Sequence, residues 1–211
     1  MNKDVNALRN TLGALGIFLP VLSYFFNRFF GCSYNLPGVF SSISATHYSS
    51  SYLLFEGLVF SVGLFLICYR GYDVKDRVLT ISSGCGAILL TLFPCSLEGA
   101  ETRNFLMLAQ KITNPIHLAS ALVFFGCLVI LIGFQFTKTG EGNTIKPGSR
   151  KWRRNILYSV CSLTMAGTLV VGIGGAKILG IPYLVYIGEG LALWAFGIAW
   201  LTKGGLILKD L

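Results

Sequence analysis

Six continuous apolar runs alternate with short polar segments along the 211-residue chain. The runs cover about residues 8–30, 52–69, 78–96, 115–136, 156–175 and 183–202. Each is close to the ~20 residues that an α-helix needs to cross roughly 30 Å of hydrocarbon. Their hydrophobicity is continuous rather than alternating, which indicates helices and not barrel strands. The pattern therefore predicts an all-α bundle of six transmembrane helices that forms one domain over residues 1–211.

Composition and charge agree with a polytopic membrane protein. Hydrophobic residues make up 54% of the chain and charged residues only 12%, whereas about 25% of residues are charged in soluble domains. The net charge of +8 would suggest a nucleic-acid partner in a soluble protein. Here most of the 17 Lys and Arg residues fall on one side of the predicted helices. By the positive-inside rule this side is cytoplasmic, so both termini are expected there and no nucleic-acid partner is expected.

A serine-rich segment, "SSISATHYSSS" (41–51), interrupts the apolar pattern between the first two runs. Two interpretations stay open. The segment, with Ser42, Ser44, Thr46 and His47, lines or caps a polar cavity through its hydroxyl groups. Alternatively, it is a solvated loop whose serines cap the second helix.

Ionisable side chains in membrane helices are costly and therefore often functional. Glu56 is expected about 6 Å below the outer boundary and Glu189 about 9 Å below it. His117 follows Asn114 in the first turn of the fourth helix, and His47 precedes the second. These groups share one depth in the outer half, and the inner half has no comparable cluster. We therefore expect an outward-facing polar pocket, and its candidate residues are Ser42, Ser44, Thr46, His47, Glu56, Asn114, His117 and Glu189.

The chemistry of these residues leaves several functions open. Imidazole and carboxylate groups are zinc ligands, so a metal site would use His47, His117, Glu56 and Glu189. The chain has no HExxH motif or other pair of metal ligands at a regular spacing. We therefore predict no cofactor, and zinc is the alternative. A serine nucleophile with a histidine base would need an orienting third group, and no G-x-S-x-G elbow is present. Each candidate also has a structural interpretation, as a side chain that bonds a nearby backbone group.

Two of the six cysteines, Cys32 and Cys95, lie at the outer ends of the first and third runs. In an oxidising compartment they are candidates for a disulfide bond. The alternative is two separate thiols.

Five stretches resemble a family of small bacterial inner-membrane proteins of unknown function. They are "SISATHY", "VGLFLICYRGYD", "TLFPC", "IHLASA" and "RRNILYSVC". The resemblance implies six helices and a bacterial inner membrane, and it implies no activity. This chain departs from the family pattern at His47, Tyr52, Leu53 and Glu56. In its general architecture the chain also loosely resembles the alkaline-ceramidase-like membrane hydrolases. The HxxxH pair of those hydrolases is absent from this sequence.

The leading hypothesis is an inner-membrane protein whose outward-facing pocket binds a lipid or a small amphiphile. It would act as a sensor, a carrier or a subunit that associates with membrane lipids, with its own copies or with another membrane protein. One alternative is a membrane-embedded, zinc-dependent hydrolase of a lipid ester or amide. A second is a proton-coupled carrier that uses Glu189. Whether the protein is an enzyme stays open.

Overall fold

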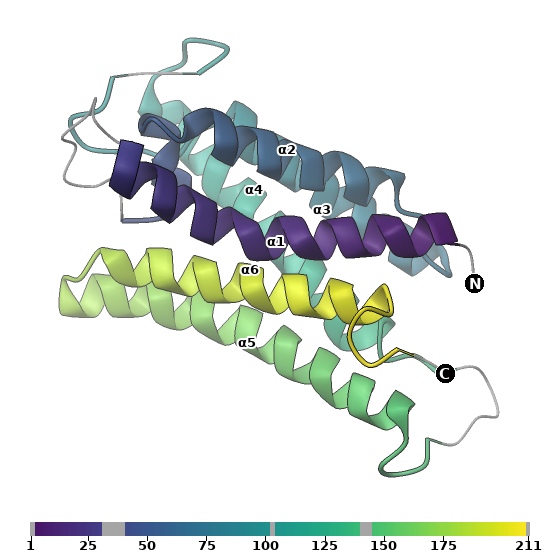
Figure 1. The fold of residues 1–211 in the computed structure, drawn as a ribbon. Helices are drawn as coiled ribbons and strands as arrows, with labels where there is room; N and C mark the ends of the chain where they lie inside the picture. The colour runs from purple at the N-terminus through teal and green to yellow at the C-terminus, as the bar shows by residue number, and fades with distance from the viewer. Residues whose placement is uncertain (1–2, 31–40, 102–103, 140–144, 210–211) are drawn as a thin grey trace.

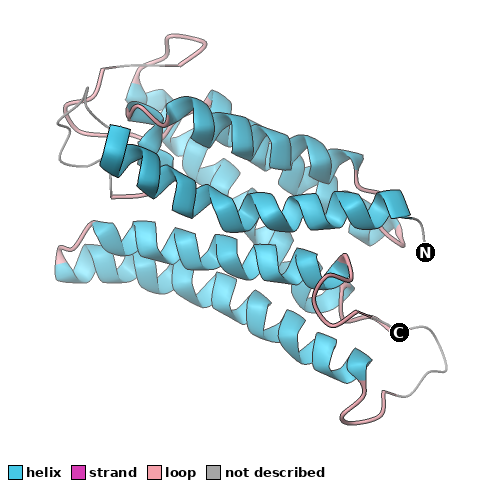
Figure 2. Cartoon of the chain, in the orientation of Figure 1, coloured by secondary structure: helices cyan, strands magenta, loops and turns pink. Residues whose placement is uncertain are grey.

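The computed structural model describes residues 3–30, 41–101, 104–139 and 145–209. Within these ranges the chain is helical and contains no strand (Figure 2). The α-helices are α1 (Lys3–Phe30), α2 (Tyr52–Cys68), α3 (Val74–Leu92), α4 (Gln110–Ile130), α5 (Arg150–Leu179) and α6 (Tyr183–Lys203). A short 3-10 helix, η1 (Ser44–Tyr48), precedes α2, and a π-helical turn, η2 (Leu131–Gln135), continues α4. The predicted all-α fold is confirmed.

Four helices are long and apolar enough to cross a membrane: α1, α4 together with η2, α5 and α6. Helix α2 is apolar but has 17 residues. Helix α3 has 19 residues and begins with the charged side chains of Lys75, Asp76 and Arg77. Four long apolar helices are typical of a membrane protein.

The six helices lie side by side, and the chain reverses its direction at each connection (Figure 1). Both ends of the chain therefore lie at the same end of the bundle, which holds Lys3 and Lys203 and is called the terminal end here. The opposite end holds η1 and is called the serine end. The most extensive helix contacts join α5 with α6, α1 with α6, α3 with α4, and α2 with α3.

Several helices begin or end at residues other than those predicted. Helix α1 begins at Lys3 rather than near residue 8, and α5 covers 150–179 rather than 156–175. The apolar pattern misses such ends because polar residues continue a helix when its first N–H groups are capped. The side chain of Ser149 accepts a hydrogen bond from Trp152 N at the start of α5. Helix α3 likewise begins at 74 rather than 78, and it ends at 92 rather than 96.

Glycines set the distance between the most closely packed helices. A Cβ atom at Gly13 of α1 would lie 2.8 Å from the carbonyl oxygen of Gly197 in α6, and one at Gly197 would lie 2.7 Å from the oxygen of Gly13. Gly63 of α2 and Gly84 of α3 form an equivalent reciprocal pair, with 2.9 and 2.6 Å. Small residues at such crossings let the helix backbones touch.

An aromatic cluster fills the core toward the terminal end. Trp200 of α6 is fully buried, and its ring packs edge-to-face against Tyr69 and Phe136 with centroids 4.9 and 5.2 Å apart. Large apolar side chains on the perimeter are exposed instead, including Leu122 on α4 and Ile178 on α5. An apolar perimeter around a packed core is what a lipid environment requires.

Candidate functional site

The serine-rich segment folds into the serine end of the bundle rather than into solvent. Thr46 is 0% exposed and His47 is 4% exposed. Thr46 Oγ1 donates to the carbonyl oxygen of Ile43 (2.6 Å), and Ser49 Oγ donates to that of Thr46 (2.7 Å). The N–H of Ala45 is bonded to the hydroxyl oxygen of Ser42 (2.9 Å). The hydroxyl groups therefore pair with the segment's own backbone, which is how non-helical chain is tolerated at membrane depth. A solvated loop does not describe this segment.

A polar face of α1 receives the end of the segment. Ser51 Oγ donates to Asn27 Oδ1 (2.9 Å) and lies 2.9 Å from Ser49 Oγ. Ser51 is the residue before α2, but its side chain makes no capping bond to that helix. Ser23, one turn before Asn27, is fully buried, and its hydroxyl group has no hydrogen-bond partner in the structure. The expectation that these serines cap α2 is therefore wrong for Ser51, which bonds α1 instead.

Glu189 of α6 holds the start of the serine segment. Its Oε2 atom accepts a hydrogen bond of 2.6 Å from the N–H of Ile43. A carboxylate that accepts backbone N–H groups in a site of low dielectric forms a strong, charge-assisted bond. Glu189 therefore links two segments that lie 146 residues apart in the sequence.

Glycines stand on either side of Glu189, at positions 188 and 190. A Cβ atom at Gly188 would lie 2.5 Å from the carbonyl oxygen of Thr168 in α5. A Cβ atom at Gly190 would lie 3.6 Å from Pro20 of α1. Gly188 therefore allows α6 to pack closely against α5, whereas a Cβ at Gly190 would make an ordinary van der Waals contact.

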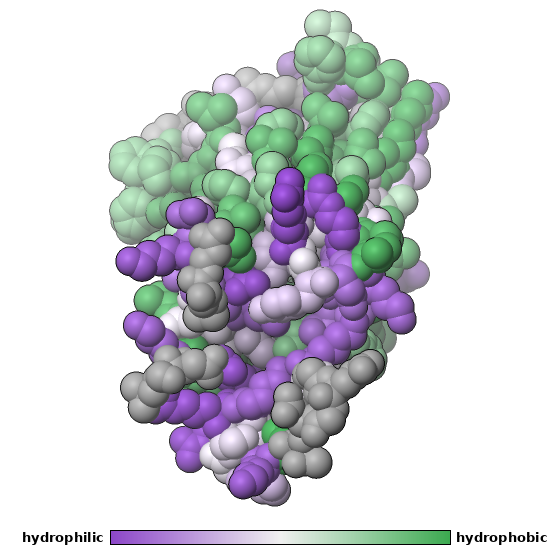
Figure 3. All heavy atoms as spheres, turned by 90° about the vertical axis from the view of Figure 1, so that its right-hand side faces the viewer, coloured by the Kyte–Doolittle hydropathy of each residue, from purple (hydrophilic) through white to green (hydrophobic). Residues whose placement is uncertain are grey.

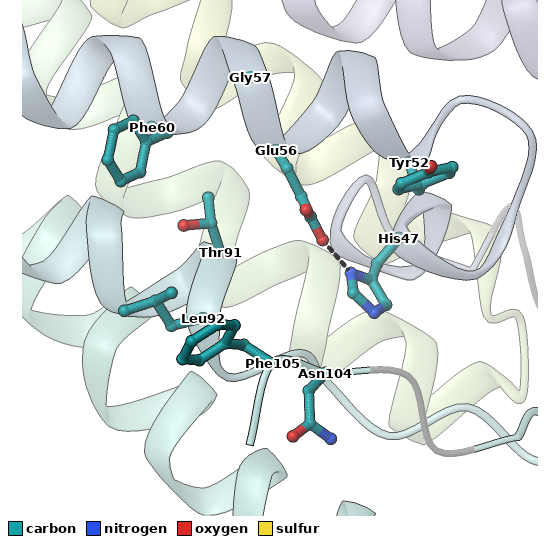
Figure 4. A pocket seen from close by; sticks show the side chains of 9 residues that line it. All are labelled: His47, Tyr52, Glu56, Gly57, Phe60, Thr91, Leu92, Asn104 and Phe105. Carbon is teal, nitrogen blue, oxygen red and sulfur yellow. Dashed lines mark ion pairs between the residues drawn. The ribbon is translucent and has the colours of Figure 1, made fainter. Parts of the chain in front are cut away.

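His47 and Glu56 form a pair at the start of α2. His47 Nδ1 lies 2.5 Å from Glu56 Oε1, and the two side chains point toward one another (Figure 4). The Glu56 side chain is 29% exposed, whereas the His47 side chain is 6% exposed. The His47 ring also packs edge-to-face against Tyr48, with centroids 4.8 Å apart. The Tyr48 ring thus packs against the buried His47 ring, whereas the Glu56 carboxylate is partly accessible to solvent.

A groove of about 480 Å³ opens beside this pair. It is lined by His47, Tyr52, Glu56, Gly57, Phe60, Thr91, Leu92, Asn104 and Phe105 (Figure 4). Its volume lies in the range of small-ligand sites. Helices α2 and α3 form its walls, and the connection between α3 and α4 contributes its rim. No Lys or Arg is among the described residues that line it.

The rim of the groove is a closed turn that presents apolar side chains. Asn104 Nδ2 donates to Leu108 O (2.7 Å), and Leu108 N donates to Asn104 Oδ1 (2.9 Å). Between them, Phe105 is 85% exposed and Met107 is 88% exposed. Met107 has a φ of 52°, a left-handed conformation that non-glycine residues rarely adopt. The turn therefore holds two large apolar side chains outside the packed bundle.

His117 and Asn114 of α4 both bind the chain that follows α3. His117 Nδ1 lies 2.9 Å from the carbonyl oxygen of Phe93, and Asn114 Oδ1 accepts from the N–H of Ser96 (2.9 Å). His117 is 4% exposed. Both side chains therefore position the connection whose later part forms the rim of the groove. Neither lines the groove itself.

Cys95 lies against the same segment. Its carbonyl oxygen accepts a hydrogen bond from the Tyr48 hydroxyl group (2.7 Å). Burial, together with the charge of Glu189, raises the pKa of the Cys95 thiol to about 12. Burial likewise raises the pKa of the Tyr48 hydroxyl to about 12. Cys32 lies outside the described residues, so the disulfide between Cys32 and Cys95 stays a prediction.

The predicted residues gather at one end of the bundle but do not form a single ligand set. Among the described residues, no three His, Cys, Asp or Glu side chains lie together as a metal site. His47 and Glu56 face the groove, whereas Glu189 and His117 bond backbone groups. A zinc site built from these four residues stays a prediction.

Comparison of the chain with protein-family models, with curated proteins and with solved structures gives no match. The resemblance to six-helix inner-membrane proteins therefore stays a prediction, and the site is interpreted from its own geometry.

Sequence reasoning missed the aromatic and apolar half of the groove. Phe60 and Leu92 belong to apolar runs and look like any lipid-facing residues. The stretch "NFLM" (104–107) could have indicated the apolar rim, because three large apolar residues stand together in an otherwise polar connection. Asn27 was also missed, although it is a polar residue inside the first apolar run.

Proposed function

We propose that this chain is an integral membrane protein of six spans that binds a lipid or small amphiphile in the groove beside His47 and Glu56. Helices α2 and α3 complete the six spans, because α2 packs against α1 and α3 packs against α4. Both termini are on the cytoplasmic side, in line with the distribution of Lys and Arg. The serine end then faces away from the cytoplasm, in a bacterial inner membrane as the resemblance implies.

The observation that carries this proposal is a polar pair at the end of an apolar groove. Glu56 and His47 supply an acceptor and a hydrogen-bonding ring, while Phe60, Leu92 and Phe105 supply apolar contact area. The groove is continuous with exposed apolar residues of α2, since Leu53 and Leu64 are 70% and 46% exposed. An amphiphile fits this arrangement with its head at the pair and its chain along α2.

The charges of the groove indicate the kind of head group. The ionisable residues that line it are one histidine and one carboxylate, without Lys or Arg among the described residues. Such a site favours hydroxyl or ammonium donors and disfavours an anionic head. Binding is better supported than hydrolysis, because the hydroxyl groups of Thr46, Ser49 and Ser51 donate to backbone or amide oxygens.

The test is direct binding of a tritiated single-chain monoacylglycerol to the full chain purified in detergent. Glu56→Leu removes the acceptor and is expected to weaken binding about tenfold or more, the value of one hydrogen bond to a charged group. Phe60→Ala is expected to weaken binding by several-fold through lost apolar area. Glu98→Leu removes an exposed carboxylate outside the groove and is the matched control.

Retained affinity in Glu56→Leu contradicts the proposal, provided that circular dichroism shows an intact helical fold. Equal displacement of the probe by an anionic alkyl sulfate also contradicts it, since no Lys or Arg is among the described residues that line the groove.

A further inference from the structure

A second cavity, of about 410 Å³, lies at the terminal end. Its lining includes five cationic side chains: Arg9, Lys138, Lys151, Arg154 and Lys203. No Asp or Glu is among the described residues that line it. Figure 3 views this end and shows hydrophilic residues gathered across it, bordered by apolar surface. The expectation that this half of the bundle has no cluster comparable with that of the serine end is therefore wrong.

Two of these cations contact aromatic side chains, and one is buried while the other is half-buried. Arg9 is 5% exposed, and its Nη2 atom donates to the hydroxyl groups of Tyr69 (3.1 Å) and Tyr72 (3.3 Å). Its Nε atom is buried without a hydrogen-bond partner in the structure. The Nζ atom of Lys203 lies over the rings of Tyr72 and Phe136, 4.8 and 4.6 Å from their centroids. Aromatic faces orient an ammonium group but do not neutralise its charge.

Two carboxylates of the described residues, Asp73 and Asp76, lie near these cations without lining the cavity. Asp73 pairs with Lys138 at 2.6 Å, and both side chains are more than two-fifths exposed. Asp76 is buried, and its Oδ2 atom accepts from the N–H of Tyr72 (2.8 Å). Within the described residues, Lys203 has no carboxylate partner. Among the described residues, the lining of the cavity therefore holds five cationic side chains and no carboxylate.

Membrane topology does not require this arrangement. Cytoplasmic Lys and Arg residues set orientation equally well from exposed positions in loops. Burying a cation without an anion is costly. Arg9 comes from α1, Lys138 follows η2, Arg154 belongs to α5 and Lys203 ends α6, so four distant segments bring cations to one cavity.

We infer that the cavity at the terminal end is a binding site for a phosphate group, carried by an anionic lipid head group or present as free phosphate. Arg and Lys side chains are the usual phosphate ligands, because their charged donors match its oxygens. Basic cavities between membrane helices on the cytoplasmic side suit anionic head groups. The site lies at the opposite end from the groove and does not rest on the function proposed for it.

The test uses the full chain purified in detergent, with native mass spectrometry and thermal unfolding as readouts. The probes are dioctanoyl phosphatidic acid, dioctanoylglycerol with the same acyl chains but no phosphate, and inorganic phosphate. Arg154→Gln and Lys203→Met each remove a cation from the cavity. Arg153→Gln removes an exposed cation beside it and is the matched control.

Phosphatidic acid is expected to bind, and Arg154→Gln and Lys203→Met are each expected to weaken binding about ten- to hundred-fold. Arg153→Gln should change the affinity less than about twofold, as a screened surface charge does. Stabilisation by phosphatidic acid alone identifies a lipid head group as the source, and equal stabilisation by inorganic phosphate identifies the free ion.

The inference is overturned if dioctanoylglycerol binds as tightly as phosphatidic acid. It is also overturned if Arg154→Gln and Arg153→Gln have the same affinity. Because Arg154 is half-buried at the cavity wall, its variant keeps the test decisive even if Lys203→Met does not fold.

Discussion

Replacing Glu189 with leucine is expected to release the serine segment from the bundle. The carboxylate accepts the N–H of Ile43 at 2.6 Å. One hydrogen bond to a charged group contributes about 1.5–3 kcal/mol, and a buried N–H left without an acceptor costs about 1–3 kcal/mol. We therefore expect Glu189→Leu to destabilise the segment by about 3 kcal/mol. Glu189→Gln keeps an acceptor oxygen and is expected to cost about 1 kcal/mol.

Hydrogen exchange followed by mass spectrometry measures this effect locally. For an opening free energy lowered by about 3 kcal/mol, the backbone amides of residues 41–51 should exchange about 100-fold faster in Glu189→Leu. Peptides from the middle of α5 should be unchanged, and Glu98→Leu should leave the segment protected. Exchange in 41–51 that is as slow in Glu189→Leu as in the wild type would refute the anchoring role of the carboxylate.

Two further predictions concern packing and pH. Gly188→Ala is expected to destabilise the protein by about 1–3 kcal/mol through overpacking against Thr168 O. Gly167→Ala, where a Cβ meets nothing within 4 Å, should not lower the thermal midpoint, and equal losses in the two variants would contradict the packing. Burial raises the pKa of Cys95 from 9.0 and that of Tyr48 from 10.0, each to about 12. The folded state therefore keeps protons that the unfolded state releases, so stability is full below about pH 9 and falls toward pH 12. Thermal midpoints across that range should show a shallower fall in Tyr48→Phe, and midpoints that rise with pH would contradict the assignment.

The helical elements were predictable because each apolar run carries its own signal. The ends of the helices were not, since the apolar pattern stops where polar residues continue the helix. The first turn and a half of α5, from Arg150, is polar and charged, yet Ser149 caps it and it stays helical. Pro115 suggested the start of the fourth helix, but α4 already begins at Gln110. Pro115 is the sixth residue of α4, and the helix continues through it with the loss of one backbone hydrogen bond.

The candidate site was predictable in location but not in pairing. Shared depth placed His47, Glu56 and Glu189 near one another, because helix rise converts residue number into depth. Their partners depend on how the non-helical segment folds, and η1 turns His47 back toward α2. Nothing in the local sequence specifies that Ile43 meets α6.

The cavity at the terminal end could not be predicted from the sequence pattern. Its cations looked like an ordinary cytoplasmic charge bias, because each lies in a separate segment. Only the packing of α1, α5 and α6 buries Arg9 and brings Lys203 over aromatic rings.

Photo-cross-linking tests the amphiphile groove most directly. A monoacylglycerol with a diazirine in its acyl chain is bound to the purified full chain, irradiated, and the labelled peptides are mapped by mass spectrometry. We predict that labels concentrate in residues 52–60 of α2 and at Phe105 on the rim, and that unlabelled monoacylglycerol and Glu56→Leu both abolish them. Labels spread evenly over the exposed faces of α1, α4 and α5, and unaffected by competitor or variant, would contradict binding in the groove.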